Sequence, residues 1–246
     1  MQLMQQILGG WFKPFFISSP SLIAQLFYKG AILGQPVSNA LGKPVYLAPY
    51  FWSTIGAVLL GFLSGVSLGL VIGLLLGTSI SAEEVLVPFA NLFNSMPIVV
   101  FIPILVLVLG VGLESKLVLA TQAVFFTIFY NVLQGSKNFD RETRENIKML
   151  GASKFDMFLN VDLPNAVSWT LAGLPNAIAI ALSAVIIIEI VSASPGLGYL
   201  LLFSTLEFQA SLTFVVMILT AAVGVILILS LSYLKKRLFP WLPEFR

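Results

Sequence analysis

Long charge-free stretches alternate with short polar ones along this chain. Five windows of at least 20 residues contain no Asp, Glu, Lys or Arg, beginning with the window between Lys43 and Glu83. About 20 apolar residues are enough for a helix to cross the hydrocarbon core of a bilayer. The sequence therefore predicts five membrane-spanning helices, at residues 52–77, 86–110, 117–135, 167–191 and 211–233.

The first fifty residues follow a different pattern. Residues 10–28 are fairly apolar but are interrupted by one Lys and two Pro, and they lack the cationic start and the small-residue cleavage site of a signal peptide. We interpret residues 1–50 as an interfacial or periplasmic segment lying on the bundle, with an abbreviated extra crossing as the alternative. Residues 51–235 then form the transmembrane domain, and residues 236–246 form a tail.

The composition indicates an all-α, polytopic transmembrane helical bundle. Hydrophobic residues make up 58% of the 246 positions and charged residues 10%, with a mean hydropathy of +0.99, whereas about a quarter of a soluble domain is charged. The absence of Cys and His excludes disulfides, thiolate or imidazole metal sites, and His-based catalysis. No P-loop motif is present. We expect no enzyme activity, catalytic residue, metal or cofactor in this chain, so any ATP would be hydrolysed by another subunit.

The charged residues are concentrated in one island. Ten of the 24 lie within the 26 positions from Lys137 to Asp162. The loop at 136–166 carries five Lys or Arg and the segment after residue 234 carries four, whereas the 192–210 connection carries none. By the positive-inside rule, the large loop and the C-terminus face the cytosol, and five spans then place the N-terminus outside.

A spaced pattern lies within this island. Glu145 is followed six residues later by Gly151, and Leu163 and Pro164 close the loop. This arrangement resembles the EAA loop of type I ABC importer permeases, E-A-A-x3-G-x9-I-x-L-P, with the two Ala and the Ile substituted. In that family the loop docks on an ATPase subunit.

Other segments resemble the nitrate/sulfonate/taurine branch of these permeases, and the resemblance covers about residues 50–235. The segments that carry it are Asn94-Ser95-Met96-Pro97, Pro103, Gly110-Val111-Gly112, Ala172-Gly173-Leu174, Glu189 and Pro195-Gly196-Leu197-Gly198-Tyr199. Pro175 replaces the Arg that is usual in this branch. The resemblance implies an importer for a small solute: a sulfonate, taurine, nitrate, bicarbonate or a heterocyclic vitamin precursor.

The resemblance also implies location and partners. It indicates a multi-pass protein of the bacterial inner membrane that works with two ABC ATPase subunits, which would hold the ATP and Mg. A second permease protomer, identical or homologous, and an extracytoplasmic substrate-binding protein complete the expected assembly. Nothing indicates nucleic acid binding.

The loop contains a predicted coupling helix. Ser153 and Asp156 have the spacing of a capping box, and a helix at about 154–161 would place Phe155, Phe158 and Leu159 on one face. Read without the family, these side chains could instead dip into the headgroup region. With the resemblance, we assign the helix to ATPase docking. The predicted coupling residues are Glu145, Gly151, Ala152, Ser153, Phe155, Asp156, Phe158, Leu159, Leu163 and Pro164.

Three residues are candidates for the pathway or its gate: Pro97, Pro103 and Glu189. Glu189 is the one acid in an otherwise apolar window, and we expect it at the outer rim, where water is near. We expect no buried Lys or Arg in the spans. A self-contained secondary transporter or channel that uses Glu189 is the alternative function.

A glycine stripe marks the first span, since Gly61 begins a series of five glycines at four-residue spacing. Small residues at this spacing let helices approach closely in lipid. The stripe predicts either packing within the bundle or a contact between protomers.

Overall fold

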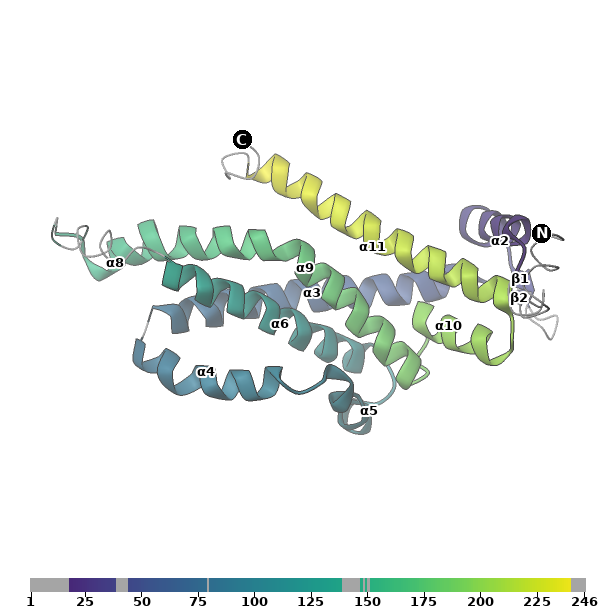
Figure 1. Ribbon diagram of the computed structural model, residues 1–246, viewed down its shortest axis with the longest axis horizontal. Helices are drawn as coiled ribbons and strands as arrows, with labels where there is room; N and C mark the ends of the chain where they lie inside the picture. The colour runs from purple at the N-terminus through teal and green to yellow at the C-terminus, as the bar shows by residue number, and fades with distance from the viewer. Residues whose placement is uncertain are drawn as a thin grey trace, which may run out of the picture.

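The computed structural model describes residues 18–38, 44–78, 80–138, 147, 149 and 151–239. These residues form helices and one short antiparallel pair of strands (Figure 1). The helices are α2 (Pro20–Phe27), α3 (Leu47–Gly77), α4 (Ile80–Asn94), α5 (Ile102–Leu109), α6 (Leu113–Asn138), α8 (Lys154–Met157), α9 (Leu163–Val191), α10 (Leu197–Leu206) and α11 (Ala210–Leu238). The strands are β1 (Val37–Ser38) and β2 (Pro44–Val45).

Among the described residues, four helical stretches are long and apolar enough to cross a bilayer: α3, α6, α9 together with α8, and α11. The pair α4 and α5 supplies a fifth crossing if it is counted as one span, although the two helices are bent by 86°. In Figure 1 this pair runs beside α6 from one end of the bundle toward the other. The predicted all-α polytopic bundle is confirmed, and its second span is broken.

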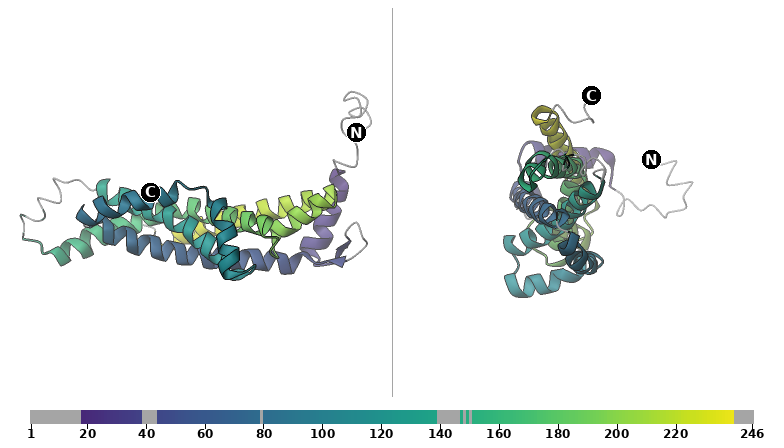
Figure 2. Two further views of the ribbon diagram at one scale, coloured as in Figure 1. Left: turned by 90° about the horizontal axis from the view of Figure 1, so that it is seen from below. Right: turned by 90° about the vertical axis from the view of Figure 1, so that its left-hand side faces the viewer.

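The elongated bundle has two distinct ends. Figures 1 and 2 show α8 beyond the C-terminal ends of α3 and α6 at one end, toward which α11 also runs. The two strands, α2 and α10 lie at the opposite end. We call these the α8 end and the α10 end. The end of α6, α8 and the end of α11 therefore lie toward one end of the bundle.

Close contact between α3 and α6 explains the glycine stripe. A Cβ added at Gly65 would lie 2.6 Å from Cβ of Val124, and one at Gly69 would lie 2.9 Å from Cβ of Ile128. The other three glycines of the stripe face α6 in the same way, one turn apart. The stripe therefore packs within the bundle, and the absence of side chains brings the two backbones together along residues 61–77 of α3 and 120–136 of α6.

The break in the second span lies at a proline. Helix α4 ends at Asn94, and Pro97 precedes a 3₁₀ turn at Ile98–Phe101 that leads into α5. The hydroxyl of Ser95 donates to the carbonyl of Asn91 at 2.7 Å, where it competes with the helical backbone bonds. Pro97 has no backbone N–H for a helical hydrogen bond and restricts the residue before it. Both effects favour the break here, although α4 does continue through Pro88.

The described part of the N-terminal segment lies across the α10 end (Figure 2). Helix α2 has eight residues and the π-helical turn Tyr28–Ile32 that continues it has five. Together they are about 20 Å long, which is too short to cross a bilayer. The hydroxyls of Ser18 and Ser211 are 2.6 Å apart and join this segment to the start of α11. This arrangement agrees with a segment lying on the bundle; residues 1–17 are outside the described part of the chain.

Helix α8 does not form the separate coupling helix that we expected at 154–161. A π-helical turn at Phe158–Asp162 joins it directly to α9, so that Lys154–Val191 is one continuous helical stretch of 38 residues. We expected Pro164 to separate the two helices. It lies instead in the first turn of α9, directly after the π-helical turn and inside the continuous stretch.

Candidate functional site

The loop before α8 has the local geometry that the sequence predicts. Gly151 has a φ of +89°, in the left-handed region that favours glycine. The Ser153 hydroxyl accepts a hydrogen bond from the backbone N–H of Asp156 at 3.2 Å, and the Asp156 carboxylate accepts one from the N–H of Ser153 at 3.0 Å. The capping box is therefore confirmed. Hydrogen bonds from the hydroxyl and then the N–H of Ser153 lower the pKa of Asp156 below its ordinary value.

The predicted aromatic face is only partly present. Phe155 is 68% exposed and Leu159 is 42% exposed. Phe158, in contrast, is half-buried and packs against the main hydrophobic core, so the expectation that all three share one exposed face was wrong. The three-residue helical step from Phe155 rotates Phe158 by about 60°, on the side away from Leu159 and toward the core. The exposed apolar side chains of α8 and of the π-helical turn after it are therefore Phe155 and Leu159.

The remaining coupling residues lie on both sides of α8. Ala152 is half-buried and its N–H donates to the carbonyl of Ile147. Leu163 and Pro164 form the first turn of α9. Glu145 lies outside the described residues.

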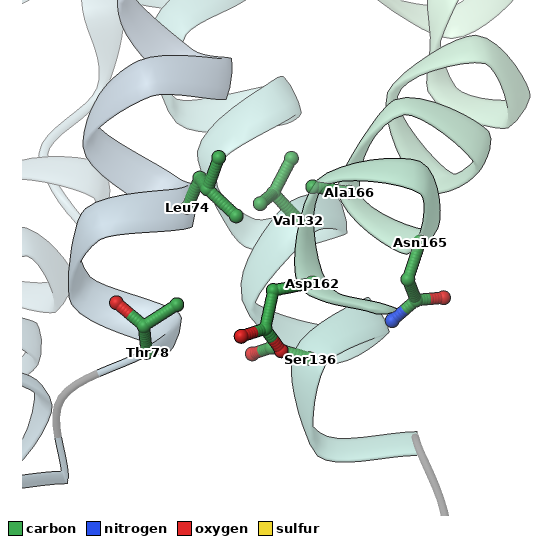
Figure 3. Close-up of a pocket in the computed structure, with 7 residues that line it drawn as sticks. All are labelled: Leu74, Thr78, Val132, Ser136, Asp162, Asn165 and Ala166. Atoms are coloured by element: carbon green, nitrogen blue, oxygen red, sulfur yellow. The ribbon is translucent and has the colours of Figure 1, made fainter. Parts of the chain in front are cut away.

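A small pocket lies between α3, α6 and α9 at the α8 end (Figure 3). It is lined by Leu74, Thr78, Val132, Ser136, Asp162, Asn165 and Ala166. The Asn165 amide donates to the carbonyl of Gly135 at 2.7 Å and joins α9 to α6 beside the pocket. The end of α9 that continues into α8 is thus connected to the neighbouring helices.

A second polar site lies at the α10 end and was not foreseen. The Lys116 ammonium group lies 2.8 Å from Oε1 of Glu189, and the two side chains are 2% and 0% exposed. Two expectations were therefore wrong: Glu189 is not a solvated rim residue, and the bundle does contain a buried Lys. Lys116 lies in the first turn of α6 and Glu189 near the end of α9, and helix packing buries both.

The hydrogen bonds of Lys116 are complete. Its ammonium group also donates to the Ser53 hydroxyl at 3.1 Å and to the carbonyl of Pro195 at 2.6 Å. An ammonium group has three N–H donors, and each finds an acceptor here. A buried charge without such partners would cost several kcal/mol.

The carboxylate of Glu189 is also fully engaged. The Thr54 hydroxyl lies 2.9 and 3.0 Å from its two oxygens, and the N–H of Gly198 donates to Oε2 at 2.9 Å. The Thr54 oxygen in turn accepts from the N–H of Leu197 at 2.9 Å. This buried ion-pair cluster joins α3, α6 and α9 to the start of α10.

The cluster explains two glycines of the turn before α10. A Cβ at Gly196 would collide with the carboxylate of Glu189. A Cβ at Gly198 would lie 2.5 Å from the carbonyl oxygen of Ile186. The turn therefore needs glycine because the backbone passes directly over the buried acid.

The other pathway candidates lie on a different surface. Pro97 and Pro103 flank the 3₁₀ turn and are both exposed, whereas Glu189 is enclosed. The prolines are thus not part of the enclosed site, although Ile102, next to Pro103, packs in one hydrophobic cluster with Ile188. Within the described ranges, no group of three or more His, Cys, Asp or Glu side chains could hold a metal ion.

Residues 65–242 match the family described as the binding-protein-dependent transport system inner membrane component. The fold and this match define the class of protein: a multi-pass membrane permease, not an enzyme. The chain belongs to this family of ABC importer permeases. Membership decides against a self-contained secondary transporter, and it implies an ATPase and a substrate-binding protein as partners.

Several curated proteins are similar over most of the chain. A probable ABC transporter permease of Haemophilus influenzae is 29% identical over 188 residues, or 76% of each chain. The taurine transport system permease protein TauC of Escherichia coli is 28% identical, covering 81% of this chain and 74% of that protein. The putative aliphatic sulfonates transport permease protein SsuC of Bacillus subtilis is 26% identical, covering 94% and 88%.

Proposed function

We propose that this chain is the permease subunit of an ATP-driven importer and that α8 docks on the ATPase subunit. The observation that carries this proposal is the exposed pair Phe155, on the capped helix α8, and Leu159, on the π-helical turn that joins α8 to the start of α9. Exposed apolar side chains on a protruding helix are typical of a surface that a partner covers. Two ATPases would then bind two permease protomers, identical or homologous.

The orientation follows from charge. The last turn of α11 carries Lys235, Lys236 and Arg237, and it lies toward the same end as α8. Positive residues favour the cytosolic side, so we place the α8 end in the cytosol and the α10 end outside. The substrate-binding protein would then deliver solute at the α10 end.

The continuity of α8 with α9 supports a mechanical route. Movement of α8 by the ATPase would be transmitted along the helical stretch from Lys154 to Val191, which reaches the ion-pair cluster at the opposite end. ATP binding would close the ATPases and rock this helix, so that the cavity opens outward; hydrolysis would reset it.

The docking role can be tested by removing the exposed side chains. We expect Phe155→Ala with Leu159→Ala to abolish co-purification of the ATPase subunit, because buried interface anchors contribute about 2 kcal/mol each, or roughly 30-fold in affinity. Leu107→Ala is the matched control, since this side chain is 84% exposed but lies on α5. Retention of the ATPase and of full transport by the double variant would refute the docking role.

The substrate is proposed from the relatives alone. Their names specify taurine, aliphatic sulfonates and, for a permease of Halalkalibacterium halodurans that is 25% identical, formylaminopyrimidine. We propose that this importer moves a small solute of the sulfonate or heterocyclic precursor class, with nitrate and bicarbonate as further members of the branch. Uptake of each labelled solute into proteoliposomes with the binding protein would decide among them.

A further inference from the structure

Three polar side chains interrupt the apolar second span. From Val85 to Gly110, Asn91, Asn94 and Ser95 are the only residues with an amide or hydroxyl side chain, and this interval contains no charge. All three are exposed. They lie at positions i, i+3 and i+4, so they share one face of the last turn of α4. We call this set the polar cluster.

The cluster lies at the break of the span and deep along the bundle. Helix α4 ends at Asn94, where the chain bends by 86° toward α5. The Tyr130 hydroxyl of α6 donates to Oδ1 of Asn91 at 2.7 Å. Tyr130 is eight residues from the end of α6 at Asn138, or about 12 Å along the helix. The cluster therefore lies at the depth of the hydrocarbon core.

Such groups are unfavourable against lipid. An amide without a hydrogen-bond partner in an apolar medium costs a few kcal/mol, and irregular backbone at membrane depth is found only inside protein or along a water-filled cavity. In transporters, discontinuous helices are the segments that carry solute sites near the midplane. The break and the polar cluster occur at the same place, which favours a solute path over a lipid contact.

We propose that Asn91, Asn94 and Ser95 line the solute path and that the amide groups of Asn91 and Asn94 offer hydrogen-bond donors to a solute with acceptor oxygens, such as a sulfonate. This deepens the proposed importer function and rests on it. The hydroxyl of Tyr130 occupies Oδ1 of Asn91, which leaves the amide N–H groups of Asn91 as donors. Tyr130 is thus a positioning residue for the cluster.

The cluster holds no full charge. No Lys or Arg lies between Val85 and Leu113, and the three donors of Lys116 are used within the ion-pair cluster. Neutral donors bind an oxyanion weakly, and a transport path requires that a solute leave as easily as it enters. The binding protein would supply the affinity, and the polar cluster would replace water around the solute during passage.

The chain has no cysteine, so single cysteines report the environment directly. We would place Asn94→Cys and Ser95→Cys in the assembled importer in proteoliposomes and measure their reaction with the anionic reagent 2-sulfonatoethyl methanethiosulfonate. Phe89→Cys and Phe93→Cys are matched controls, because both are exposed on the opposite face of α4. We expect the cluster positions to react at least about tenfold faster, since a thiolate forms in water and not in lipid. Equal rates on both faces would overturn the path.

The sulfonate preference has its own measurement. We would measure how fast a cysteine reacts with the sulfonate reagent and with neutral methyl methanethiosulfonate, and divide the first rate by the second. This ratio at Asn94→Cys is compared with the ratio at Phe155→Cys, an exposed position outside the path. We expect a higher ratio at the cluster, and a lower ratio after Asn91→Leu. A ratio equal to that at Phe155→Cys would overturn the acceptor-oxygen class. ATPase co-purification, measured on the same variants, reports docking separately, so loss of the docking role and loss of the path are distinguishable.

Discussion

Removing one partner of the buried ion pair gives the sharpest test of the packing at the α10 end. Lys116→Met keeps the length of the side chain but leaves the carboxylate of Glu189 without its counter-charge at a site that is 0% exposed. Three hydrogen bonds of the ammonium group are lost, to Glu189, Ser53 and Pro195. Breaking a buried pair in this way costs about 3–5 kcal/mol of folding free energy.

The second half of the test is a double-mutant cycle. Glu189→Gln alone leaves the buried ammonium group uncompensated, and we expect a loss of similar size. The double variant removes both charges, and neutral replacements of a buried pair are often tolerated. We therefore expect the double variant to be no less stable than either single variant, which corresponds to a coupling of about 3 kcal/mol.

The assay is reversible unfolding in mixed detergent micelles, followed by the fluorescence of the four tryptophans of the chain. Lys236→Met is the matched control: this lysine is exposed in the last turn of α11, and its removal should change stability by less than about 0.5 kcal/mol. If the two single effects add to within about 0.5 kcal/mol in the double variant, the two residues do not interact and the cluster as described is wrong.

Three further predictions concern other parts of the bundle. Gly65→Val should destabilise the protein by about 1–3 kcal/mol in the same unfolding assay, because its side chain would meet Val124 and a backbone carbonyl of α6; unchanged stability would contradict the α3–α6 packing. Lys236→Cys should react with an impermeant reagent only from the cytosol, and Gln35→Cys only from the outside. Labelling of both cysteines from the same side would overturn the orientation. At saturating ATP, a protonophore should not change uptake by the unmodified protein or by Glu189→Gln, because a structural ion pair carries no proton. If the protonophore abolishes uptake by the unmodified protein, transport includes a proton-coupled step.

The buried pair also changes how Glu189 is understood. An acid in an apolar window suggests a functional group by default, and a solvated rim position would make its loss mild. The structure encloses the carboxylate among Lys116, Thr54 and the backbone of Gly198. Its role is to hold the turn before α10 against three helices, so variants at this site should be judged by stability before transport.

The sequence alone determined the features that depend on near neighbours in the chain. Charge-free length predicts the crossings, and the spacing of Ser153 and Asp156 predicts the cap of α8. These features depend on hydrogen bonds and steric restrictions within a few residues, which a sequence displays directly.

Only the tertiary structure decided which distant groups meet. Lys116 and Glu189 are 73 residues apart, and nothing in the local pattern of either residue indicates the other. The partner of the glycine stripe and the inward direction of Phe158 likewise depend on where α6 and the core lie. Helix packing sets these contacts, because it fixes the rotation of each helix about its axis. The periodicity of apolar residues along a helix cannot predict that rotation when the helix is apolar on nearly all sides.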